Sequence, residues 1–240
     1  MPFWRRMFRS VLDLVSPRGC LMCGDRLSIS ERLLCTSCNM EIERTGEHLK
    51  PYDNVSARLF WGKLPIERCA AYLMYHPHSD FAQVIYDLKY RGHYEIGEEL
   101  GLAMAREYSG SGFFDGIDMI VPMPLHPRRE RERGYNQCRE IAMALSHATR
   151  IPMRDDVVVR CRNTVSQTTL DHADRADNVN NAFALAKPDA VRGRHVLLVD
   201  DIVTTGSTLS ACGSAVAKAD GVRISIATVG RTDITWGFGI

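Results

Sequence analysis

Two adjacent carboxylates, Asp200 and Asp201, directly follow an apolar run at 196–199. A turn rich in hydroxyl groups follows, and a helical pattern begins after it. The turn consists of Thr204, Thr205, Gly206, Ser207 and Thr208. The first amides of a helix lack partners within the helix, and with the positive end of its dipole they favour a phosphate group. Carboxylates instead suit sugar hydroxyls or a Mg2+ ion carried by the ligand. The stretch therefore predicts a site for a sugar phosphate.

The apolar run before the acids predicts a strand that is buried on both faces, because it lacks polar alternation. Strands of this kind form parallel sheets, and open α/β folds bind ligands at the carboxyl ends of such strands. The helix after the turn is predicted to continue through Leu209, Cys212, Ala215 and Val216. An ordinary strand, turn and helix with a capping hydroxyl is the simpler alternative. It explains one threonine or serine, but not two acids beside a phosphate cradle.

A second polar segment follows the strand predicted at 117–121. Pro122 and Pro124 fix the loop after this strand and withhold N–H groups. An arginine-rich stretch and the sequence Gly-Tyr-Asn-Gln come next. The candidate ligand-binding residues of this segment are Arg128, Arg133, Asn136 and Gln137. Because guanidinium groups bind phosphate oxygens in pairs, we interpret the segment as a clamp for a polyanion such as pyrophosphate. A solvated charged loop is the alternative, since Glu130 and Glu132 offset part of the charge.

A further basic loop is predicted after 156–160, which we interpret as the second core strand. The candidate ligand residues in this loop are Arg160, Arg162 and Gln167. A long basic and hydroxyl-bearing segment, extending to Asn178, suits a lid that closes over a reacting ligand. A surface excursion with helix-capping residues is the alternative.

Upstream, 70–75 predicts an edge strand, and helical spacing over 81–88 and 95–108 predicts two helices. We interpret these three elements as a hood over the mouth of the main sheet. Lys89 and Arg91 follow the first helix and face either the ligand or solvent.

The amino-terminal part of the chain contains two Cys-x2-Cys pairs with eleven residues between them: Cys20, Cys23, Cys35 and Cys38. This spacing is typical of a tetrahedral zinc site with four thiolate ligands. A segment this short cannot bury a core of its own, so the metal would supply its folding free energy. Thiolates fill every coordination position, and the predicted zinc is therefore structural.

The first 15 residues place apolar side chains at helical spacing with Arg5, Arg6 and Arg9 between them. A basic amphipathic helix of this kind either makes peripheral contact with a membrane or a partner, or packs on its own domain. The sequence leaves both readings open.

The chain of 240 residues has a formal net charge of +1, so its overall field favours neither nucleic acid nor membrane. No apolar run reaches the roughly 18 residues that a transmembrane helix needs. The first residues also lack the small-residue cleavage site of a secretory signal. We therefore predict a cytoplasmic protein, in which reducing conditions keep the cysteines as thiols.

Three features occur in order: the four-cysteine segment, the Pro-x-Pro…Arg-Gly-Tyr-Asn-Gln segment, and the acid pair with its turn. In this combination the chain resembles the ComF family, phosphoribosyltransferase-like proteins linked to DNA uptake in bacterial competence and to gluconate utilisation. The resemblance covers nearly the whole chain after the first 15 residues. It implies an amphipathic helix at 1–15, a zinc ribbon at 16–50, and an α/β type I phosphoribosyltransferase-like domain at 51–240, with a parallel sheet flanked by helices.

The resemblance also implies a ligand, phosphoribosyl pyrophosphate (PRPP) with Mg2+. By resemblance, Asp200 and Asp201 hold the ribose hydroxyls, the turn at 204–208 holds the 5-phosphate, and the loop at 121–124 holds pyrophosphate. Two classes of function follow from it. One is an enzyme that transfers phosphoribosyl to an acceptor that the sequence does not name. The other is a non-catalytic binder of PRPP or single-stranded DNA in DNA uptake, with a DNA-uptake helicase as a candidate partner.

Overall fold

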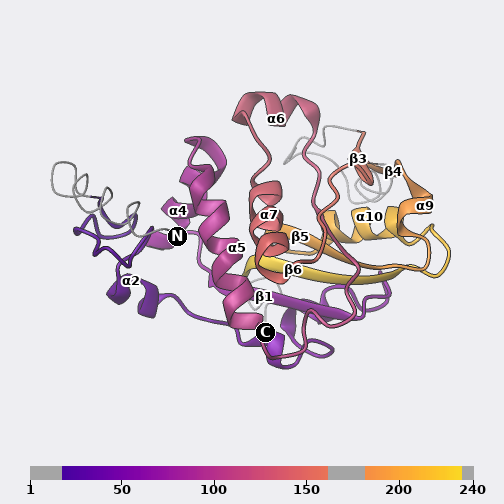
Figure 1. The fold of residues 1–240 in the computed structure, drawn as a ribbon, viewed down its shortest axis with the longest axis horizontal. Coiled ribbons are helices and arrows are strands. Elements are labelled where there is room, and N and C mark those ends of the chain that lie inside the picture. Colours follow the sequence, from indigo (N-terminus) through magenta and orange to yellow (C-terminus); the bar gives the residue numbers. More distant parts are fainter. Residues whose placement is uncertain (1–17, 162–181, 234–240) are drawn as a thin grey trace, which may run out of the picture.

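A parallel four-stranded sheet forms the centre of the computed structural model, which describes residues 18–161 and 182–233 (Figure 1). The strand order is β1-β6-β5-β2. The strands are β1 (Arg68–Tyr75), β2 (Met119–Pro122), β5 (His195–Val203) and β6 (Arg223–Thr232). Strand β5 contains the acid pair and lies between β2 and β6, with Val199 opposite Pro122 and Asp200 opposite Thr228. The predicted parallel α/β sheet is confirmed.

Helices cover both faces of this sheet. The longer ones are α4 (Asp80–Tyr90), α5 (Tyr94–Tyr108), α7 (Gln137–Thr149) and α10 (Ser207–Val216). The short elements are α2 (Thr36–Glu41), η1 (Glu47–Leu49), α3 (Val55–Arg58), α6 (Pro127–Arg133), α9 (Pro188–Val191), β3 (Val158–Arg160) and β4 (Phe183–Leu185). None of the helices in the described part of the chain is long and apolar enough to cross a bilayer.

Strand β5 is buried on both faces because successive side chains point to opposite sides of a sheet. Val196 and Leu198 belong to the core that α10 shares, whereas Leu197 and Val199 belong to the core of α4, α5 and α7. All four side chains are fully buried. The predicted doubly buried strand is confirmed, and β5 continues to Val203, beyond the acids.

Close packing of α5 against α7 positions the amino end of α7 next to the acid pair. A Cβ added at Gly101 in α5 would lie only 2.5 Å from the carbonyl oxygen of Ile141 in α7. The missing side chain therefore lets the two helix backbones approach, and Ile141 and Leu145 of α7 are fully buried. Figure 1 shows α5 and α7 as neighbours, with the exposed α6 above α7.

The prediction of a second core strand at 156–160 is wrong. β3 pairs antiparallel with β4 in a separate two-stranded sheet. Beside β2 the chain instead forms an isolated parallel bridge from Met153 to Ile120, and Asp156 then binds Arg154 and Lys187. Three consecutive valines at 157–159 favour a strand locally, but this run pairs outside the main sheet.

The interpretation of 70–75, 81–88 and 95–108 as a hood over the mouth of the main sheet needs correction, because all three elements belong to the main fold. The predicted edge strand at 70–75 is confirmed as part of β1, but it is the outer strand of the main sheet itself. Helices α4 and α5 share a hydrophobic core with β5 and α7. Their long apolar faces therefore make them a layer of the main fold.

The cysteine-containing segment is joined to the sheet by backbone and side-chain contacts. The amide of Met74 in β1 donates to the carbonyl oxygen of Glu43, and the amide of Thr45 donates to that of Tyr72. Buried Glu47 accepts hydrogen bonds from the amide of Ala71 (2.9 Å) and pairs with Arg231 in β6 (2.9 Å). The segment from 43 to 47 thus runs along the outer edge of β1. The predicted domain boundary at 50 and 51 stays a prediction, and the predicted helix at 1–15 lies outside the described residues.

Candidate functional site

The two acids lie near the carboxyl end of β5, and their side chains meet different elements. Asp200 Oδ1 accepts a hydrogen bond from Cys138 Sγ in α7 at 3.2 Å and from the amide of Asp201 at 2.9 Å. Asp201 Oδ2 accepts from Gln137 Nε2 at 2.8 Å and lies 3.0 Å from Lys89 Nζ. The first turn of α7 therefore contacts both carboxylates, and the end of α4 contacts the second.

Lys89 faces the acid pair, whereas Arg91 does not. The Lys89 side chain is only 22% exposed, and the Arg91 guanidinium pairs with Asp87 at 3.3 Å on the surface of α4. Burial opposes the charged form of Lys89, but the carboxylates of Asp201 and Asp200 outweigh it and raise its pKa. Lys89 therefore remains an ammonium at neutral pH.

The turn after β5 is open toward solvent on one side and packs against Phe60 on the other. Thr204, Thr205, Ser207 and Thr208 are exposed, and the hydroxyls of Thr205 and Ser207 lie 2.9 Å apart. Gly206 has a left-handed φ of 73°, and a Cβ there would lie 3.1 Å from the ring of buried Phe60. Glycine is thus required by the turn and by this packing. Helix α10 begins at Ser207, so its first amides lie at this open turn.

Four of the predicted ligand residues line one cavity of about 210 Å3. They are Pro122, Pro124, Asn136 and Arg160. The side chain of Asn136 is nevertheless committed to structure, because it donates to the carbonyl oxygen of Met123 (3.0 Å) and accepts from the amide of Cys138 (3.0 Å). It caps α7 and ties that helix to the loop after β2.

The arginine-rich segment forms the exposed helix α6, and its two candidate residues differ in position. Arg133 donates to Gln137 Oε1 (2.9 Å), and Gln137 in turn binds Asp201. Arg128 pairs with Glu132 (2.9 Å), with more than half of each side chain exposed. Within the described residues, no hydrogen bond or ion pair joins Arg128 to the acids. Arg162 and Gln167, with the rest of the predicted lid to Asn178, lie outside the described residues.

Asp200 has a perturbed acidity. Burial among β5, α7 and α10 raises the pKa of Asp200 to about 6, and the charge of Asp201 adds to the rise. The Cys138 thiol and the Lys89 ammonium act in the opposite direction. The charge of Asp200 also acts on Arg160 and on Cys212 of α10. Asp200 therefore changes its protonation within the range of ordinary buffers.

This raised pKa predicts a pH dependence of stability. The native state holds the Asp200 proton more tightly than the unfolded chain, in which an aspartate has a pKa of about 3.9. The stabilisation is fully present below pH 4 and is lost as pH rises through about 6. We expect a loss of about 2 kcal/mol between pH 4.5 and 8, out of about 3 kcal/mol in all, that Asp200→Asn removes. Melting curves of both proteins from pH 4.5 to 8 measure it, and equal slopes for the two would contradict the assignment.

The four cysteines form a second cluster, away from the acids. Their sulfur atoms all lie within 4.8 Å of one another, and Cys23 Sγ is 3.7 Å from Cys35 Sγ. A tetrahedral zinc with Zn–S bonds of about 2.3 Å separates its sulfur ligands by about 3.8 Å. The cluster therefore fits a zinc ion. The left-handed Gly24 (φ 77°) completes the first cysteine turn.

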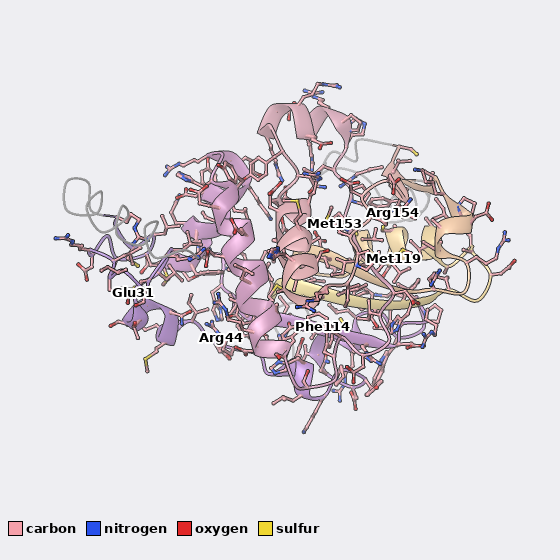
Figure 2. All side chains as sticks on the ribbon, viewed as in Figure 1. Glu31, Arg44, Phe114, Met119, Met153 and Arg154 are labelled. Carbon is pink, nitrogen blue, oxygen red and sulfur yellow. The ribbon has the colours of Figure 1, made fainter. Side chains whose placement is uncertain are left out.

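Glu31 stabilises the cysteine segment through hydrogen bonds to its backbone. Its carboxylate accepts hydrogen bonds from the amides of Ser28 (2.8 Å) and Thr36 (2.6 Å), which lower its pKa to about 2. Figure 2 shows Glu31 on the opposite side of the molecule from Met119 in β2. The four cysteines form a cluster distinct from the acid pair, and their segment packs on the core of α4 and α5 through Leu21, Met22, Leu33 and Leu34.

Sequence reasoning did not include Cys138 among the candidate site residues and left Lys89 undecided. The Cys138 thiol nevertheless donates to Asp200. Its position directly after Gln137 was a usable signal, because adjacent residues in the first turn of a helix can reach neighbouring groups. Lys89 had no such signal, since it is far from Asp201 in the sequence.

Comparison with known proteins agrees with this geometry. Residues 136–236 match the phosphoribosyl transferase domain family. DNA utilization protein YhgH of Escherichia coli (strain K12) is 29% identical over 230 residues, covering 91% of this chain and 99% of that protein. Competence protein F of Haemophilus influenzae is 29% identical over 206 residues, covering 80% of this chain and 87% of that protein. The chain is thus a homologue of proteins named for DNA utilization and competence, and it contains a phosphoribosyl transferase domain.

Two more distant matches were also found. Competence protein ComFC of Bacillus subtilis is 24% identical to this chain over 201 residues, covering 84% of this chain and 72% of that protein. A solved structure of glutamine PRPP amidotransferase from B. subtilis aligns with a TM-score of 0.40 at 17% identity, covering 57% of this chain and 26% of that one. That likeness is too low to carry an argument about function.

Proposed function

We propose that this protein binds PRPP with Mg2+ at the carboxyl end of β5 and transfers its phosphoribosyl group to an acceptor. One observation carries the proposal. The acid pair lies near the end of β5, and an open turn rich in hydroxyl groups follows it at the start of α10. Asp200 and Asp201 would accept the ribose hydroxyls. The turn at 204–208 would bind the 5-phosphate through amides and hydroxyls.

The pyrophosphate leaving group would lie toward the loop after β2. Pro122, Pro124 and Arg160 line the cavity there, and Arg133 reaches the same acid pair through Gln137. In phosphoribosyl transfer the bond to pyrophosphate breaks early and leaves an oxocarbenium-like sugar. The chain's own groups then position the partners and stabilise separated charge, with arginines on the leaving group and carboxylates at the sugar. Mg2+ would neutralise pyrophosphate oxygens, and carboxylates suit this hard cation.

A second candidate function is the binding of single-stranded DNA. Exposed Tyr86 and Tyr90 of α4 lie with ring centroids 4.9 Å apart. Arg91 lies over the Tyr86 ring at 5.8 Å, and Arg133 over the Tyr90 ring at 4.9 Å. Exposed aromatic rings with cations provide stacking platforms for bases beside a polyanionic backbone. The printed names of the relatives, DNA utilization protein and competence protein F, agree with this candidate.

Measuring pyrophosphate release separates the two functions. With PRPP, Mg2+ and a panel of amines and nucleobases, we expect pyrophosphate release with at least one acceptor and its loss in Asp200→Asn. Salt-sensitive binding of single-stranded DNA without turnover would select the second function. Arg91→Gln weakens only the tyrosine surface, and it serves as the matched variant for the DNA measurement.

The remaining parts of the proposal concern the whole chain. We propose a structural zinc in a ribbon at 16–50, a phosphoribosyltransferase-like domain at 51–240, and a cytoplasmic location. Contact with a DNA-uptake helicase, and peripheral membrane contact through 1–15, remain proposals that partner capture and vesicle binding can test.

A further inference from the structure

The acid pair already holds a cation of the protein's own. Lys89 Nζ lies 3.0 Å from Asp201 Oδ2, and the two side chains are only 22% and 8% exposed. The same carboxylate oxygen accepts the amide hydrogen of Gln137 Nε2 at 2.8 Å. Asp201 is therefore fixed by one charged and one neutral donor, both from helices that pack on β5.

The other ligand atoms around the pair would otherwise suit a metal ion. Oxygens of Asp200 and Asp201 and the sulfur of Cys138 all lie within 4.8 Å of one another, a spacing that one divalent cation could bridge. Two carboxylates in this space attract such an ion, whereas an ammonium against one of them repels it. The burial of Asp201 limits the screening of this repulsion by water and salt.

We propose that Lys89 is a positioning residue that takes the place of a free divalent cation at the acid pair. It keeps Asp201 oriented toward sugar hydroxyls and prevents the empty site from binding metal alone. A divalent ion then enters only as a complex with the ligand's phosphates. The inference concerns the same acids as the proposed function, but its metal-exclusion step does not require PRPP.

The test uses the full chain, loaded with zinc, and follows free Mn2+ by electron paramagnetic resonance. We expect the wild type to bind Mn2+ weakly, and Lys89→Gln to bind one additional Mn2+ with at least tenfold higher affinity. Lys89→Arg keeps the charge and should resemble the wild type. Arg91→Gln removes a cation from the exposed end of α4 and should also change nothing. Adding Asp201→Asn to Lys89→Gln should abolish the gain.

Equal Mn2+ affinity in the wild type and Lys89→Gln would overturn the inference. If Lys89→Gln does not fold, the wild type still decides: tight Mn2+ binding that Asp201→Asn removes would overturn it, and weak binding unchanged by Asp201→Asn supports it. A Mn2+ gain without any effect of PRPP on melting would instead sink the proposed function alone. A PRPP effect without a Mn2+ gain would sink this inference alone.

Discussion

PRPP with Mg2+ raises the melting temperature of the wild type by about 5–10 °C, and the double variant Asp200→Asn with Asp201→Asn shows no rise. A ligand at one hundred times its Kd stabilises the native state by about 2.7 kcal/mol. For a chain of this length, each kcal/mol raises the melting temperature by about 2–4 °C. Both amides retain the shape of the carboxylates, but they lose the charge that accepts ribose hydroxyls strongly. Differential scanning fluorimetry with and without ligand measures the difference.

The control for this experiment is Asp189→Asn. Asp189 in α9 pairs with Arg192 at 2.9 Å, and more than half of each side chain is exposed, so the substitution removes an acid without touching the pair on β5 or the cavity beside it. The ligand-dependent rise should persist in this variant. Absence of a rise in the wild type, or its survival in the double variant, would contradict a PRPP site at these acids.

Loss of one cysteine ligand, in Cys20→Ser, removes the zinc and unfolds the ribbon while the sheet stays folded. Cys20 is buried in a small cluster with Leu27 and Cys38, which is too small a core to fold without the metal. We expect metal analysis to find about one zinc per wild-type chain and less than a tenth of that in the variant. Hydrogen exchange should show loss of amide protection within 18–42 and unchanged protection in β5 and β6.

Cys161→Ser provides the matched control, because Cys161 is exposed and lies outside the four-cysteine cluster. Its zinc content and exchange pattern should equal those of the wild type. Zinc well below one per wild-type chain, together with four freely titratable thiols in the native protein, would refute the structural zinc.

Local patterns in the sequence were sufficient wherever neighbouring residues build one feature. The apolar run, the acids, the turn and the start of α10 are consecutive, so strand, turn and helix could be predicted together. The cluster of four cysteines could be predicted equally well, since their spacing alone restricts the ligand geometry.

Features that depend on distant pairing could not be predicted in this way. The valine run at 157–159 has the composition of a core strand, but its partner is β4 and not the main sheet. Lys89 and Asp201 meet only because α4 and β5 share one core. Asn136 illustrates a third case, in which a candidate ligand residue instead caps a helix and holds the loop after β2. A sequence pattern predicts local secondary structure, whereas these three pairings depend on tertiary contacts.

A crystal structure of the protein with PRPP and Mg2+ tests most directly whether the strand-end acids and the turn form one pocket for a phosphorylated pentose. We predict electron density for the 5-phosphate on the amides and hydroxyls of 204–208, with the ribose hydroxyls on Asp200 and Asp201. Density for the ligand at another place, or a ribose turned away from both carboxylates, would contradict this account.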